Sequence, residues 1–228
     1  LFNRYHFQMD ASVYTSYRSE LYQNNTTVYD TVRTGGRFFL VRPLPQLFLK
    51  AGAGVYSEAV YSQEGSDFSS YQINVLSIYV EYLNINQPLN PSQGIQSRLT
   101  LEKAGDIFGQ SLGGIDFMRL SYFYTQYVPI SDSTTLAYRI FSGYYRKISS
   151  TETFETEKFS LGGANTLRGY KELSFYGDYR LSFNIEPRFQ LTDSLVGVVF
   201  LDVGYIVDSL SSINSSNLLT GYGVGVRF

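Results

Sequence analysis

The chain has 228 residues, a formal net charge of −2 and no cysteine. Its charge gives no electrostatic footprint for nucleic acid, and without cysteine it has no disulfide framework, thiol nucleophile or cysteine-ligated metal site. No run approaches the roughly 20 apolar residues of a membrane-spanning helix, although 43% of the residues are hydrophobic and 17% are aromatic. A β-barrel in lipid and a soluble β-sandwich both account for this composition.

Apolar and polar residues alternate along most of the chain, which indicates β-strands. In the first such segment Tyr5, Phe7 and Met9 alternate with polar residues. In residues 178–191 every even position is polar and every odd position is apolar. In chain order, the ten predicted strands cover residues 3–17, 28–42, 46–61, 71–84, 94–104, 114–130, 134–146, 177–191, 195–208 and 218–228.

The strand lengths and the connections indicate a membrane barrel. Most segments exceed the about 5–6 residues usual in soluble sheets and reach the about 9–11 residues that a tilted strand needs to cross a bilayer. Short connections alternate with long ones, as periplasmic turns alternate with extracellular loops in outer-membrane barrels. We therefore predict an all-β, transmembrane antiparallel β-barrel of about ten strands in a bacterial outer membrane, which occupies residues 1–228. The long connections lie near residues 18–27, 62–70, 105–113, 147–176 and 209–217.

The connection 147–176 differs from the others because it is long and lacks strand alternation. It contains Phe159-Ser-Leu-Gly-Gly-Ala-Asn-Thr-Leu-Arg-Gly-Tyr170, in which three glycines permit tight turns around a single arginine, Arg168. A long connection inside a compact β fold is usually functional. A plain surface loop is the alternative interpretation.

Three motifs resemble the Omp85 superfamily, whose members insert or translocate proteins at outer membranes. Leu-Gly-Gly…Leu-Arg-Gly-Tyr at 161–170 is similar to the family's inward-folded sixth loop. Phe200-Leu-Asp-Val-Gly204 resembles its Phe-x-Asp-x-Gly signature, and Asn184–Phe189 lies on the strand where the family carries an inward glutamate. Weaker matches are 42–44, 89–91 and 223–228, so the resemblance runs from about residue 30 to the end of the chain.

The same residues follow from strand phase. Glu186 and Asp202 lie on the polar faces of adjacent predicted strands, so we expect both carboxylates to point into the lumen. An arginine from an inward-folded loop could bridge them with bidentate geometry. The resemblance implies such a contact, and we carry its role as a lock to Arg168, Glu186 and Asp202, named the lock residues below.

Other residues of the motifs are expected to support the lock. Phe200 and Tyr170 are expected to pack beside the guanidinium of Arg168, where a cation–π contact contributes about 0.5–2 kcal/mol. The supporting residues are Gly162, Gly163, Leu167, Gly169, Tyr170, Phe200 and Gly204.

The resemblance implies transport without enzymatic chemistry. We expect no catalytic residue, cofactor or metal; the only histidine, His6, has no defensible triad partners. The barrel is expected to assemble β-barrel proteins or to export polypeptides. Its expected partners are outer-membrane lipid, unfolded β-barrel or secreted polypeptide substrates, and accessory assembly subunits. The Leu-Arg-Gly-Tyr form favours assembly factors, and the alternative is a passive outer-membrane pore in which residues 147–176 form a plug.

The predicted strand count is lower than the count of the family. Barrels of the superfamily have sixteen strands and follow soluble periplasmic domains, whereas ten strands are predicted here. We therefore expect an interior portion of a sixteen-stranded barrel, with about four strands before Leu1 and two after Phe228. A shortened ten-stranded barrel is the alternative.

Overall fold

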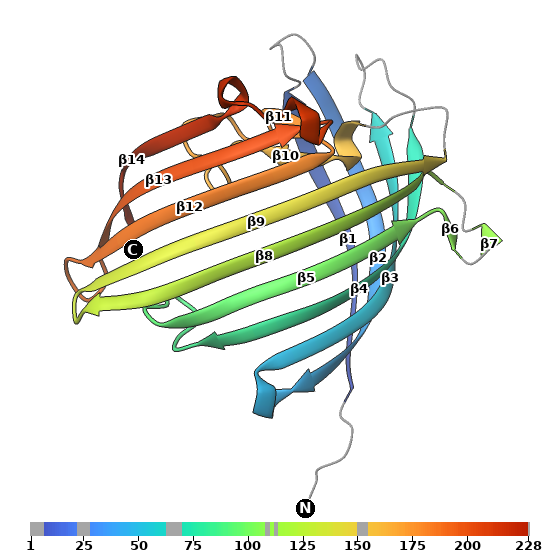
Figure 1. Cartoon of the computed structure of the whole chain (residues 1–228). Coiled ribbons are helices and arrows are strands. Elements are labelled where there is room, and N and C mark those ends of the chain that lie inside the picture. The colour runs from blue at the N-terminus through green and yellow to red at the C-terminus, as the bar shows by residue number, and fades with distance from the viewer. Residues whose placement is uncertain are drawn as a thin grey trace, which may run out of the picture.

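Ten long strands form one antiparallel sheet, in which each long strand pairs with the long strands before and after it along the chain. The computed structural model describes residues 7–21, 28–62, 70–107, 110–111, 114–149 and 155–227. Figure 1 shows the sheet curving into the wall of a barrel, with β1 at one edge and β14 at the other. Within the described residues these two edge strands do not pair with each other. The long strands are β1 (Gln8–Leu21), β2 (Val28–Leu44), β3 (Leu49–Ser62), β4 (Tyr71–Ile85), β5 (Gly94–Ala104), β8 (Asp116–Ser131), β9 (Thr134–Ser149), β12 (Tyr179–Gln190), β13 (Val196–Val207) and β14 (Leu219–Arg227).

Buried polar and charged side chains lie on the concave face beside a cluster of buried apolar ones around Ile73 and Phe117, and large apolar side chains are exposed on the convex face. In β12 the residues Ser182 and Glu186 are 2% and 5% exposed, whereas Leu181 and Phe183 are 49% and 38% exposed. Successive side chains of a strand point to opposite faces, so this contrast follows directly from the period-two pattern. Large exposed apolar side chains on one face and buried charges on the other are typical of a barrel with a polar lumen and a lipid-facing exterior.

None of the helices in the described part of the chain is long and apolar enough to cross a membrane.

The observed strand ends differ from the predicted ones where a local turn intervenes. β3 begins at Leu49, later than predicted, because Pro45–Leu47 forms a 3₁₀ turn and Phe48 adopts the left-handed conformation with φ 53°. β1 extends to Leu21 because it continues to pair with β2 as far as Val28. Residues 3–6, with His6, and the final Phe228 lie outside the described residues.

The connection predicted at 147–176 is not free of strands, which corrects the sequence interpretation. It contains a 3₁₀ turn, η2 (Glu155–Glu157), and two short strands, β10 (Phe159–Leu161) and β11 (Phe175–Gly177), which pair with each other. Each strand has three residues, which is too short to produce a recognisable alternation. The predicted connection 105–113 likewise contains two paired strands of two residues each, β6 (Asp106–Ile107) and β7 (Gln110–Ser111).

The segment that carries β10 and β11 packs against the concave face of the sheet (Figure 1). Leu161 and Leu167 are fully buried there, in contact with Ile206 of β13. Glycines of the sheet make room for this contact: a Cβ atom at Gly204 would lie 2.9 Å from Leu161 Cδ2, and one at Gly143 would lie 2.8 Å from the ring of Phe159. That the segment is an extracellular loop stays a prediction.

Candidate functional site

Arg168 is carried by a tight turn between β10 and β11. Gly162 and Gly163 have φ values of 119° and 99°, which residues with a side chain rarely adopt. Thr166 closes the turn: its hydroxyl donates to the carbonyl of Gly162 at 2.6 Å, and the amide of Leu167 donates to the carbonyl of Gly163 at 3.1 Å. Gly169, with φ 93°, follows directly and redirects the chain. The three glycines therefore direct Arg168 out of the turn.

Asp202 of β13 binds Arg168 at three atoms. The guanidinium donates Nε to Oδ2 and Nη2 to Oδ1, both at 2.7 Å, which is the side-on bidentate geometry. The backbone amide of Arg168 donates to the same Oδ2 at 2.9 Å. Since the side chain of Asp202 is 0% exposed, its carboxylate depends on this arginine for compensation of its charge.

Glu186 of β12 collects the remaining contacts of the site. One carboxylate oxygen accepts a hydrogen bond from Nη1 of Arg168. The other lies 2.9 Å from Nε of Arg188, on the same strand, and 2.8 Å from Nη2 of Arg227 on β14. Glu186 therefore connects the loop to two elements of the barrel wall.

Aromatic and apolar side chains surround the lock residues, but not all at the predicted positions. The ring of Phe200 lies 3.6 Å from Cζ of Arg168, at cation–π distance. Tyr170 was also expected beside the guanidinium; it packs instead on Phe175, with ring centroids 5.4 Å apart. Gly169 reverses the chain between Arg168 and Tyr170, so the two side chains have different partners. Leu167 is a buried member of the apolar cluster against which Tyr170 and Phe175 pack.

Opposing effects act on the charge of Arg168. Burial lowers the pKa of its guanidinium, but the hydrogen bonds to Asp202 and Glu186 outweigh burial and raise that pKa above its ordinary value. These hydrogen bonds therefore stabilise the charged form of Arg168, which is the form that arginine takes in proteins. Its contact with the two carboxylates is electrostatic and does not involve proton transfer.

The backbone of β14 approaches Arg168 closely at a glycine. A Cβ atom at Gly221 would lie 1.9 Å from the carbonyl oxygen of Arg168. Only glycine, which has no side chain, permits this approach. β14 is therefore the third strand of the wall, after β12 and β13, that contributes to the site.

The sequence of the chain matches a known protein family. The Omp85 superfamily domain matches residues 2–228. The chain belongs to the Omp85 superfamily.

Solved structures of other proteins show the same fold. BamA from Haemophilus ducreyi lacking POTRA domains 1–3 superposes with a TM-score of 0.74 at 12% identity, over 96% of this chain and 52% of that one. CdiB from Acinetobacter baumannii superposes with a TM-score of 0.61 at 14% identity, over 97% of this chain and 41% of that one. The predicted fold class is confirmed, and the chain spans about half the length of these proteins or less. No curated protein sequence matches the chain.

In this Omp85 barrel the structure brings the lock residues together and adds four that the sequence analysis missed as site residues. Asn184 donates to the carbonyl of Thr166 at 2.8 Å and fixes the turn. Arg188 and Arg227 both lie inside the motif matches and on inward phases, and this signal could have identified them. Gly221 carried no such signal, because only the folded loop shows why a side chain is excluded there.

Proposed function

We propose that this chain forms the barrel of an outer-membrane protein that inserts β-barrel proteins into the membrane or exports polypeptides, and that the lock residues hold its loop in the lumen. The observation that carries the proposal is the contact of a loop arginine with the fully buried Asp202 inside a barrel wall of the Omp85 superfamily. The exposed apolar exterior supports outer-membrane lipid as its surroundings.

The mechanism we propose needs no bond-making chemistry. The cavity beside Arg168 has a volume of about 60 Å³, which is too small for a peptide. A polypeptide that used this part of the lumen would therefore have to displace the loop. In barrel assembly, substrate strands would instead pair with a strand edge of the barrel, and the position of the loop would set the shape of the wall behind that edge. In both cases the lock residues determine whether the loop is docked.

We propose assembly of β-barrel proteins as the more specific function, on the Leu-Arg-Gly-Tyr form of the turn. Unfolded β-barrel polypeptides would be the substrates, and accessory subunits would be partners. Export of a secreted polypeptide is the alternative activity within the same proposed function.

The test is Arg168→Ala in cells that depend on the full-length protein. This substitution leaves Asp202 buried without its cation; loss of one partner of a buried pair costs about 3–5 kcal/mol, and less where lumen water screens the charge. We expect a barrel that still shows heat-modifiable gel mobility but is impaired in outer-membrane protein biogenesis or secretion. Lys171→Ala removes an exposed cation of the same loop and is the matched control.

A charge swap separates the lock from a general loss of packing. Asp202 is a better swap partner than Glu186, because Glu186 also pairs with Arg188 and Arg227. We expect Arg168→Asp with Asp202→Arg to recover part of the activity; the contact from the backbone amide of residue 168 is not restored. Folded variants with normal biogenesis and secretion would contradict the proposal.

A passive pore with a plug is the second candidate, because the burial of Leu161 and Leu167 against the wall also suits a plug. Single-channel conductance distinguishes the two functions. A pore predicts that Arg168→Ala raises conductance without any defect in biogenesis or secretion.

A further inference from the structure

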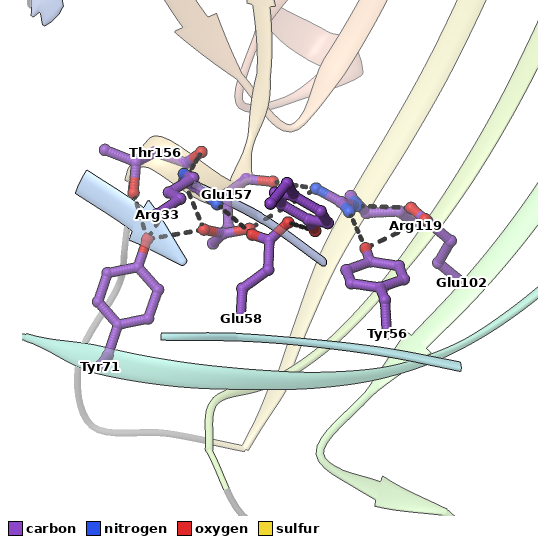
Figure 2. A network of polar contacts seen from close by, with 9 residues as sticks. Arg33, Tyr56, Glu58, Tyr71, Glu102, Arg119, Thr156 and Glu157 are labelled. Atoms are coloured by element: carbon purple, nitrogen blue, oxygen red, sulfur yellow. Dashed lines mark hydrogen bonds and ion pairs between the residues drawn. The ribbon is translucent and has the colours of Figure 1, made fainter. Parts of the chain in front are cut away.

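A second polar network lies on the concave face and also involves the loop. Its loop residues are Thr156 and Glu157 of η2, which precedes β10. Figure 2 shows Glu157 between Arg33 of β2 and Arg119 of β8, with Tyr71 of β4 beside it. No residue of this network belongs to the lock.

Glu157 is the charged centre of this network on the loop side. Its side chain is 1% exposed, lies 2.7 Å from Nη2 of Arg33 and 3.7 Å from Nη1 of Arg119, and accepts a hydrogen bond of 2.6 Å from the hydroxyl of Tyr71. A buried carboxylate without such partners would be strongly unfavourable. The contacts therefore specify a position for this residue of the loop.

The wall also binds the backbone around Glu157. Arg33 donates to the carbonyl of Thr156 at 3.3 Å, and Arg119 donates to the carbonyl of Glu157 at 3.4 Å. The hydroxyls of Thr156 and Tyr71 lie 2.6 Å apart. The site therefore receives a short chain segment as well as a single carboxylate.

The two arginines of this network retain partners on the wall when the loop is absent. Arg33 lies 3.1 Å from a carboxylate oxygen of Glu58, and Arg119 lies 2.9 Å from one of Glu102. Asp202 differs: among the described residues, Arg168 is the cation within ion-pair distance of it. Release of Glu157 thus leaves both wall arginines paired, whereas release of Arg168 leaves the buried carboxylate of Asp202 without its cation.

We propose that Glu157 is a second anchor of the loop, and that the loop opens from this end while Arg168 stays docked. The wall site is formed by Arg33, Tyr71 and Arg119. Glu157 is a positioning residue: it acts by holding the loop and touches no substrate. The proposal rests on the proposed function only for the consequence of opening, since the anchor itself is a property of the folded barrel.

Hydrogen exchange of the full-length protein in lipid, followed by mass spectrometry, tests the anchor. The amide of Lys158 donates to the carbonyl of Glu155, and the amide of Arg168 donates to Asp202, so each end of the loop has its own reporter. In the unaltered protein we expect faster exchange at 157–161 than at 166–170. Glu157→Gln should raise exchange at 157–161 by about tenfold or more, since hydrogen bonds to charged groups are lost.

The controls make the result specific. Glu172→Gln removes an exposed carboxylate of the same loop and should leave exchange unchanged. Glu157→Ala also removes the acceptor and should exceed Glu157→Gln. In both Glu157 variants, β12 and β13 should keep the exchange of the unaltered protein.

Three outcomes overturn the proposal: unchanged exchange at 157–161 in both Glu157 variants, an equal rise at 157–161 and 166–170, or a rise that includes β12 and β13. A transport assay on the same variants distinguishes failure of the Glu157 anchor from failure of the proposed function. Faster exchange at 157–161 without a transport defect would support the anchor and contradict the proposed role of the loop in transport. A transport defect in Arg168→Ala together with unchanged exchange in Glu157→Ala would support the proposed function and contradict the anchor.

Discussion

At the scale of single residues, both ends of the loop meet the wall through a buried carboxylate and an arginine. Asp202 and Glu157 are almost fully inaccessible, and each desolvated charge costs several kcal/mol unless partners compensate it. Arginine suits this task because its planar fork supplies several donors in fixed geometry. The polarity is reversed between the two ends, since the loop supplies the cation at Arg168 and the anion at Glu157.

Gly221→Ala tests the close approach of β14 to the lock at this scale. The new methyl group would lie 1.9 Å from the carbonyl oxygen of Arg168, and neither backbone can yield without movement of the loop. We expect docking of the loop to weaken by about 1–3 kcal/mol, the usual cost of overpacking. Faster exchange of the Arg168 amide, with unchanged heat-modifiable mobility, would be the measured result.

Gly225→Ala is the matched control for that substitution. It lies on the same strand and the same inward phase, but its methyl group would meet only Cγ2 of Val198, at 3.3 Å. Equal exchange of the Arg168 amide in the two variants would show that Gly221 has no special relation to the lock.

At the scale of elements, Glu186 ties three segments together. It belongs to β12, contacts Arg168 of the loop and pairs with Arg227 of β14. Asp202 makes no comparable link, because its ion pair reaches the loop alone among the described residues. The two carboxylates of the lock therefore have different structural consequences.

Glu186→Gln and Asp202→Asn should separate these consequences. The chain has no cysteine, so a single cysteine at Val226 can carry a nitroxide spin label on the outward face of β14. We expect Glu186→Gln to increase label mobility modestly, since Arg227 is half exposed and such pairs contribute about 0.2–1 kcal/mol. Asp202→Asn should leave the label unchanged. Equal mobility in the two variants would contradict the separate roles.

The sequence predicts the elements to the extent that period two determines them. All ten long strands were predicted, because alternation decides which face of a strand each side chain occupies. Strand ends were less accurate, as at Phe48, where a single left-handed residue delays β3. The positions of Glu186 and Asp202 followed from strand phase, and Arg168 from its glycine-rich motif.

The Glu157 site could not be predicted in this way. Its wall residues lie on β2, β4 and β8, and β3 and β5 separate these strands in the sheet. Only the curvature of the wall brings Arg33 and Arg119 to one carboxylate (Figure 2). Glu157 itself sits in a 3₁₀ turn, where no periodicity marks an inward direction.

At the scale of the whole molecule, the loop bridges two separate parts of the wall. One end contacts β2, β4 and β8, and the other contacts β12, β13 and β14. β10 and β11 pair with each other, and they lie along the chain on either side of the turn that carries Arg168. The described part of the loop is therefore held against the wall at two separate places, at Glu157 and at Arg168.

The apolar convex face of the barrel predicts that a charged residue there is costly in a bilayer. Leu201 lies in the middle of β13 and is 44% exposed on the convex face. In a soluble protein, lysine at such a surface position would change the free energy of unfolding by less than about 0.5 kcal/mol. In a bilayer we expect Leu201→Lys to cost about 2–4 kcal/mol near the midplane. Urea unfolding in lipid vesicles measures this free energy.

Thr100→Lys, on the lumen wall beside Glu102, supplies the matched charge on the polar face and should cost much less. Equal costs at the two positions would mean that the convex face does not meet lipid.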